Sequence, residues 1–129
     1  MAMKLRRALD MSSGEMMGED VVAALEAGAG SSRFCAGLAT LALEHVFNGV
    51  WTRPGLDRRG RSLITMAMLI ALRQTEELKV HVMGAIRNGC TVQEIEETIC
   101  HATAYVGFPA AVQAAAAATE VLRKEGLIE

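Results

Sequence analysis

The chain has 129 residues, a length that fits one domain, and its net charge is −2 with histidine neutral. A hydrophobic share of 51% excludes a disordered chain, and the near-balanced charge argues against a nucleic-acid-binding protein. The mean hydropathy of +0.24 is more than a small domain buries in its own core. We therefore expect a single domain over residues 1–129 that covers apolar surface by contacting copies of itself.

Membrane insertion and secretion are not expected from the sequence. The longest mostly apolar run, residues 62–72, is far shorter than the roughly 20 residues of a membrane span. The basic start of the chain is not followed by the apolar segment of a signal peptide. Cys35, Cys90 and Cys100 lack the spacing of a zinc site or a disulfide framework, so we expect three reduced thiols in the core or an interface. The protein is predicted to be cytoplasmic.

Helices joined by short turns are predicted in chain order, because Ala, Leu and Met dominate and proline occurs only twice. A first short helix is expected over residues 3–11 and a second over 19–27, followed by a flexible AGAGSS stretch at 27–32. Ser32 is the expected cap of a third helix, which runs to about Phe47 and stops at Asn48-Gly49. Residues 51–62 are expected to form a loop with Asp57 as a candidate cap, before an apolar, central helix that ends near Leu72.

The second half of the chain carries clearer boundary signals. A helix over residues 76–88 is closed by Gly89, and Thr91 with Glu94 forms a capping box that opens the next helix. That helix has an amphipathic stripe made of Val92, Ile95, Ile99, Ala102 and Val106. Gly107 ends it and Pro109 begins the last helix, whose alanines at 110–118 suit either a tight core or interface or ordinary helical filler.

Four arginines lie within nine residues beside Trp51. Arg53, Arg58, Arg59 and Arg61 can bind carboxylates through two parallel hydrogen bonds each. The alternative is a solvated loop whose arginines pair with neighbouring carboxylates.

Two histidines have residues that could support them one helical turn away. Glu77 precedes His81 by four residues, so its carboxylate can orient the imidazole of a general acid or base. His81 lies on the flank of the apolar stripe of its helix and should be partly buried; the alternative is a surface ion pair. His101 has Glu97 and Tyr105 at the same spacing but lies off the apolar stripe, so a surface or interface position is the alternative. No metal-binding pattern is present.

Three segments together resemble the carboxymuconolactone decarboxylase family. They are VWTRPGLDRRGRSLITMAMLIAL at 50–72, EELKVHVMGAIRNGCTVQEIEE at 76–97 and HATAYVGFPAA at 101–111. The resemblance implies an all-α, alkylhydroperoxidase-D-like helical bundle that assembles as a homo-oligomer, typically a hexamer built as a trimer of dimers. The peroxidase branch of that superfamily carries CxxC four residues before the histidine. Gln74 and Glu77 occupy those positions here, so the resemblance places the chain in the decarboxylase branch.

The family's reaction removes CO₂ from 4-carboxymuconolactone and gives the enol-lactone of 3-oxoadipate in aromatic catabolism. The resemblance implies this activity, or one on a related small carboxylated lactone or oxo-acid, without a metal or other cofactor. It implies that Arg53 and Arg61 bind substrate carboxylates, with Arg58 and Arg59 as weaker candidates, and that Trp51 lies beside the substrate. His81 would be the acid/base group oriented by Glu77, and His101 and Tyr105 would complete the pocket, from the same or a neighbouring subunit.

The chain departs from the family pattern at a few positions. Phe47-Asn48 replaces a usual Trp-Gly, and Val106 and Val112 replace Cys and Asn. These changes leave the substrate open. Two other readings also remain: a non-catalytic oligomeric binding or accessory protein on the same scaffold, and a thiol-dependent peroxidase.

Overall fold

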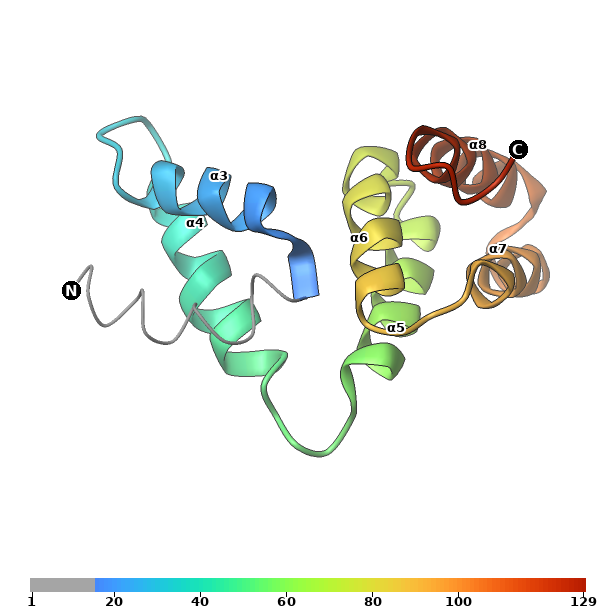
Figure 1. Ribbon diagram of the computed structural model, residues 1–129, viewed down its shortest axis with the longest axis horizontal. Coiled ribbons are helices and arrows are strands. Elements are labelled where there is room, and N and C mark those ends of the chain that lie inside the picture. Colours follow the sequence, from blue (N-terminus) through green and yellow to red (C-terminus); the bar gives the residue numbers. More distant parts are fainter. Residues whose placement is uncertain (1–15) are drawn as a thin grey trace. The chain divides into compact units, whose positions relative to one another are not determined.

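The computed structural model describes residues 16–129, and these residues form two compact units that divide between Asp57 and Arg58 (Figure 1). Every regular element in this part of the chain is a helix, which confirms the predicted all-α class. None of the helices in residues 16–129 is long and apolar enough to cross a membrane. The helix expected over residues 3–11 lies outside the described residues, and one domain over the whole chain stays a prediction.

The first unit contains α3 (Glu19–Ala29), α4 (Gly37–Leu41) and the π-helix η1 (Ala42–Val50). The predicted helix over residues 19–27 is confirmed and runs two residues further. It packs closely on α4 at Gly28, where an added Cβ would lie 3.1 Å from the Cβ of Ala39. That spacing is tighter than ordinary van der Waals contact, so a side chain at this position would require the helices to shift.

The expected third helix is wrong at both of its ends. It begins at Gly37 and not after Ser32, because the chain between Ala29 and Gly37 forms turns. It also continues through Asn48-Gly49 to Val50 as a π-helix. Gly49 does not take the positive φ that would end a helix, so the predicted stop signal does not operate.

The second unit contains four helices: α5 (Arg58–Ala71), α6 (Thr75–Arg87), α7 (Val92–Val106) and α8 (Phe108–Lys124). Helix α5 packs on α6 and α7, and α8 packs on the same two helices, whereas α6 and α7 contact each other only slightly (Figure 1). The four helices therefore form a bundle in which α6 and α7 occupy diagonal corners. The loop predicted to reach residue 62 is wrong, since α5 already begins at Arg58, directly after Asp57.

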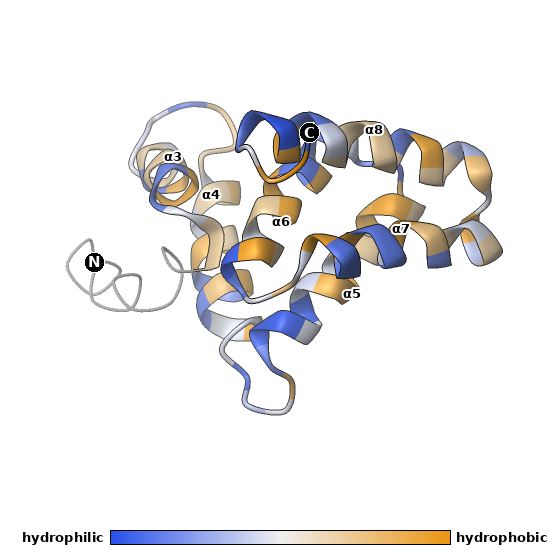
Figure 2. Cartoon of the chain, turned by 45° about the vertical axis from the view of Figure 1, so that its right-hand side comes forward, coloured by the Kyte–Doolittle hydropathy of each residue, from blue (hydrophilic) through white to orange (hydrophobic). Residues whose placement is uncertain are grey.

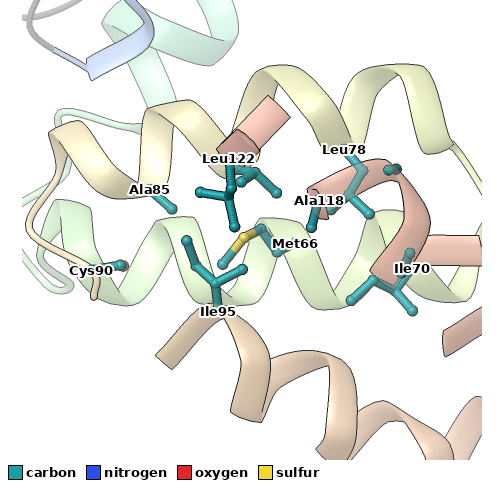
Figure 3. Close-up of a cluster of buried hydrophobic side chains, with 11 residues drawn as sticks. Met66, Ile70, Leu78, Ala85, Cys90, Ile95, Ala118 and Leu122 are labelled. Carbon is teal, nitrogen blue, oxygen red and sulfur yellow. The ribbon is translucent and has the colours of Figure 1, made fainter. Parts of the chain in front are cut away.

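The core of this bundle fills the space between the four helices (Figure 3). Met66 of α5 points toward Ile95 of α7 and Leu122 of α8, and Leu78 of α6 lies near Ile70 of α5. The remaining members of the predicted α7 stripe pack against this core, which confirms the stripe; they are Val92, Ile99, Ala102 and Val106. Figure 2 shows that polar and apolar residues alternate along each helix, as expected for helices that bury one side.

Local signals set the boundaries of α6, α7 and α8 as predicted. Gly89 follows α6 with φ +94°, and Gly107 separates α7 from α8 with φ +89°, conformations that favour glycine. The capping box is present: Thr91 Oγ1 accepts from the backbone N–H of Glu94 over 3.1 Å, and the carboxylate of Glu94 accepts from the N–H of Thr91 over 2.9 Å. These ends fix the orientation of α7 relative to the chain that enters it.

Small side chains let α8 approach its neighbours closely. The buried alanines of this helix are 110, 111, 114, 117 and 118, and three of these five belong to the core cluster. This favours the tight-core explanation of the alanine run. Cys90 is buried in the core as predicted, whereas Cys35 and Cys100 are exposed on the single chain, so an interface position for these two stays a prediction.

Candidate functional site

Helix α6 presents the predicted acid/base pair. Glu77 lies in its first turn and is exposed, and His81 follows four residues later, partly buried beside the fully buried Val82. The predicted partial burial of His81 is therefore confirmed. Burial lowers the pKa of His81 below its ordinary value of 6.5, and the negative charge of Glu77 opposes that shift.

This arrangement suits proton transfer near neutral pH. A partly buried imidazole with a lowered pKa is mostly neutral at pH 7, so it does not hold a proton permanently. A negatively charged ligand beside it would favour the imidazolium and raise its pKa again. The pair on α6 can thus take up a proton when an anion binds and release it during a reaction.

Three of the four clustered arginines lie on α5 and not on a loop as predicted. Arg59 forms an ion pair with Glu94 of α7, which matches the alternative explanation for this residue. Arg58 and Arg61 lie three residues apart on the same side of the helix, and both are partly buried. Arg61, the residue predicted to bind a carboxylate, is therefore on a rigid element of the second unit.

Trp51 and Arg53 belong to the first unit, directly after η1. Trp51 is buried, and its ring lies 6.3 Å from that of Phe47. The hydroxyl of Thr52 donates to the backbone carbonyl of Asn48 over 2.7 Å, and the N–H of Arg53 donates to the carbonyl of Val50 over 3.2 Å. These bonds hold the turn that carries the exposed Arg53 against the end of the π-helix.

His101 and Tyr105 lie together in a groove between α5 and α7. Their ring centroids are 5.2 Å apart, and Tyr105 is 78% exposed. The groove has a volume of about 900 Å³, and its walls are mostly apolar side chains such as Ile64 and Val106. Glu77, His81 and Arg61 are not among the residues that line it. Within the second unit, the predicted site residues thus lie in three places. Glu77 and His81 are on α6, Arg61 is near the start of α5, and His101 and Tyr105 are in the groove.

Several groove residues were not predicted as site residues. Glu94, Thr98 and Cys100 line it together with His101, and Ile64 and Ala67 enter it from α5. The i, i+4 spacing of Glu97, His101 and Tyr105 was visible in the sequence, whereas the contribution of α5 depends on the packing of two helices. Within residues 16–129 no group of three His, Cys, Asp or Glu side chains is placed to hold a metal ion.

Comparison with known proteins identifies a family and two relatives. Residues 36–120, which include every predicted site residue, match the carboxymuconolactone decarboxylase family. The chain is 44% identical over 78 residues to 4-carboxymuconolactone decarboxylase of Acinetobacter baylyi (strain ATCC 33305 / BD413 / ADP1), covering 60% of this chain and 58% of that protein. It is 45% identical over 74 residues to nitrosuccinic acid decarboxylase npaB of Metarhizium robertsii (strain ARSEF 23 / ATCC MYA-3075), covering 57% of this chain and 52% of that protein. The matched part thus spans just over half the length of these relatives.

Proposed function

Because the chain belongs to the carboxymuconolactone decarboxylase family, we propose that it is a cofactor-independent decarboxylase of a small acid with two carboxylates. Its substrate is 4-carboxymuconolactone or a related carboxylated lactone, oxo-acid or nitro acid. The two relatives, named as decarboxylases of 4-carboxymuconolactone and of nitrosuccinic acid, support this class of reaction. The observation that carries the proposal is the Glu77–His81 pair on α6, within the matched residues.

The two acids share the chemistry that such a site must perform. Each carries one carboxylate that stays and one that leaves next to an electron-accepting group, a conjugated lactone carbonyl or a nitro group. When the C–C bond breaks, CO₂ departs and the electron pair moves into that group, giving a delocalised carbanion. The carbanion then takes a proton at carbon. The substrate's own electron sink removes the need for a metal or an organic cofactor.

His81 supplies the proton in this reaction. The two carboxylates of the bound substrate raise the pKa of the imidazole, so binding is accompanied by proton uptake at His81. The imidazolium stabilises the negative charge that develops as CO₂ leaves, and one of its N–H groups then protonates carbon. Glu77 is a positioning residue, since its carboxylate favours the charged imidazole from the preceding turn. One proton is consumed for each CO₂ released.

The arginines bind the carboxylate that stays. We assign this role to Arg61 and Arg53, because a guanidinium binds a carboxylate through two parallel hydrogen bonds. Arg58 and Arg59 stay the weaker candidates, and Arg59 forms an ion pair with Glu94. Trp51 is proposed to provide an apolar wall next to Arg53. His101 and Tyr105 are proposed to complete the pocket from a neighbouring subunit, because the groove that holds them in the same chain is not lined by His81.

We also propose that the chain forms a homo-oligomer, as a hexamer built from three dimers, in the cytoplasm. Ile64 and Met68 of α5 and Leu72, which directly follows this helix, are 44%, 60% and 67% exposed and follow each other at four-residue spacing. A row of this kind is what a helix buries against another helix. A Met68→Glu substitution should therefore reduce the mass measured by light scattering, and an unchanged mass would place the contact elsewhere.

The activity is tested by following CO₂ release from 4-carboxymuconolactone and from nitrosuccinate, with EDTA present and with succinate as a control acid that lacks an electron sink. We expect release from at least one of the first two acids and none from succinate. No release from either acid by a folded oligomer would contradict the proposal and favour the non-catalytic binding protein. The peroxidase reading is disfavoured, because Gln74 and Glu77 stand where its two thiols would be.

A further inference from the structure

One side of α5 is apolar although it is exposed. Its residues recur at steps of three and four, the spacing of side chains that share one side of a helix, and none is polar or charged; they are Ile64, Ala67, Met68, Ala71 and Leu72. Leu72 directly follows α5 and continues its last turn, because its N–H donates to the carbonyl of Met68 over 2.9 Å. We call these five residues the α5 seam. A helix face of this kind is normally covered by another helix.

The α5 seam is complementary to a copy of itself. Large side chains at 64, 68 and 72 alternate with alanines at 67 and 71. When two such helices pack antiparallel, the large row of each lies along the alanine row of the other, so the helices approach closely. A two-fold axis between Ala67 and Met68 produces this arrangement. It sets Met68 of each copy against Ala67 of the other, and Ile64 of each copy against Ala71 of the other.

The groove between α5 and α7 lies beside the α5 seam, because Ile64 and Ala67 belong to both. Among the described residues that line this groove are the carboxylates of Glu94 and Glu97, and none of them is a lysine or arginine. Glu94 already pairs with Arg59, whereas Glu97 is exposed. The groove therefore offers a negative charge to the helix that covers the seam.

A second copy supplies the matching positive charge. Arg73 comes directly after the α5 seam and is exposed. The two-fold axis that sets Ile64 against Ala71 of the second copy also brings Leu72 and Arg73 of that copy beside Leu63, which lines the groove. Another protein would need the same alternation of large and small side chains and a cation at the same place. A copy of this chain meets both conditions.

We propose that α5 of a second copy packs antiparallel on the α5 seam, and that Arg73 of each copy pairs with Glu97 of the other across the groove. The inference rests on the homo-oligomer of the proposed function and deepens it, since it names the helix, the register and the ion pair of one interface. The docked copy also covers the groove that contains His101 and Tyr105, so both side chains come to lie between two subunits.

Cysteine pairs test the register in a chain that carries Cys35→Ser and Cys100→Ser, because both native thiols are exposed. Ile64→Cys and Ala71→Cys chains with tags of different length, expressed together and oxidised, should form a covalent dimer with one chain of each kind. Either variant alone should form few dimers, because its two thiols are about 10 Å apart along the paired helices, beyond the reach of a disulfide. In the control mixture, Gln93→Cys replaces Ile64→Cys, since Gln93 is exposed on α7 and does not line the groove.

Charge reversal tests the ion pair. Arg73→Glu and Glu97→Arg should each raise the concentration at which the oligomer dissociates by about threefold or more, because each places like charges together. The two substitutions in one chain should restore the wild-type value. Sedimentation velocity measures the dissociation, and Lys124→Glu, on an exposed residue at the end of α8, is the control that should leave it unchanged.

Two results would overturn the register: the absence of mixed dimers, and an equal yield of dimers from Ile64→Cys chains alone. Charge reversals whose effects add instead of cancelling would overturn the ion pair. A wild-type chain that is monomeric would overturn this interface together with the proposed oligomer. None of these measurements uses CO₂ release, so mixed dimers from a protein that releases no CO₂ would contradict the decarboxylase proposal alone.

Discussion

The side chain of Asn88, at the end of α6, donates a hydrogen bond to the hydroxyl of Ser62 in α5, and Ser62 is 1% exposed. The two residues are 26 positions apart in the sequence, so this bond joins the end of one helix to the start of another. The bond also gives a hydrogen-bond partner to Ser62, which is the one buried polar residue among those the structure describes. The pair therefore helps to fix the relative position of α5, which carries Arg61, and α6, which carries His81.

Removing one partner of this pair should destabilise the fold. Asn88→Ala leaves the buried hydroxyl of Ser62 unsatisfied, which is expected to cost about 1–3 kcal/mol in the free energy of unfolding. The single substitutions, the double substitution with Ser62→Ala and the wild type form a double-mutant cycle measured by urea unfolding. Effects that simply add would show that the two side chains do not interact.

The capping box of α7 should contribute measurably to stability. Thr91→Ala removes the acceptor for the N–H of Glu94 and is expected to lower the free energy of unfolding by about 1 kcal/mol. Thr91→Ser keeps a hydroxyl and serves as the matched control, with a much smaller expected loss. Equal losses in the two variants, measured by denaturant unfolding, would argue against a capping role.

Met66 should be among the most sensitive core positions. Its side chain is 1% exposed and lies between Ile95 and Leu122, so truncation leaves a cavity that the surrounding helices cannot fill (Figure 3). Met66→Ala is expected to cost about 2–5 kcal/mol. Met68→Ala, on the exposed side of the same helix, is the control. Measured in protein dilute enough to be monomeric, it should lower the free energy of unfolding far less than Met66→Ala does.

The pH dependence of stability should reflect His81. Its pKa is lowered by burial, so below pH 6.5 the unfolded chain binds more protons at this residue than the folded protein does. The contribution of His81 to stability is therefore intact above pH 6.5 and decreases as the pH falls toward the lowered pKa. In an NMR titration, the imidazole midpoint should lie below 6.5 and fall further in Glu77→Gln. A midpoint at or above 6.5 in the free wild type would contradict this account.

Local sequence signals predicted the second unit well because they act over a few residues. The Thr91–Glu94 box, the glycines at 89 and 107 and the α7 stripe each depend on neighbours within one or two helical turns. The burial of His81 followed from its position beside the Leu78–Val82 stripe in the same way. These features could be predicted without knowing how the helices pack.

Features that depend on packing could not be predicted. The groove that contains His101 and Tyr105 requires α5 to lie against α7, and the Arg59–Glu94 ion pair joins the same two helices. The π-helix has no sequence signal, and it carries the chain through Asn48-Gly49, where a stop was expected. Asn48 appeared in the sequence only as a departure from a family pattern, and its buried side-chain oxygen without a hydrogen-bond partner became visible only in the structure.

The most direct test of the central claim is the initial rate of CO₂ release by His81→Gln with the acid that the wild type accepts. The account predicts a loss of at least about 100-fold in kcat, with helical content and mass unchanged, because no other group is assigned to protonate the carbanion. His45→Gln, on an exposed residue of η1, should keep the wild-type rate. A His81→Gln variant that retained more than about a tenth of the wild-type rate would contradict the assignment of His81 as the proton donor.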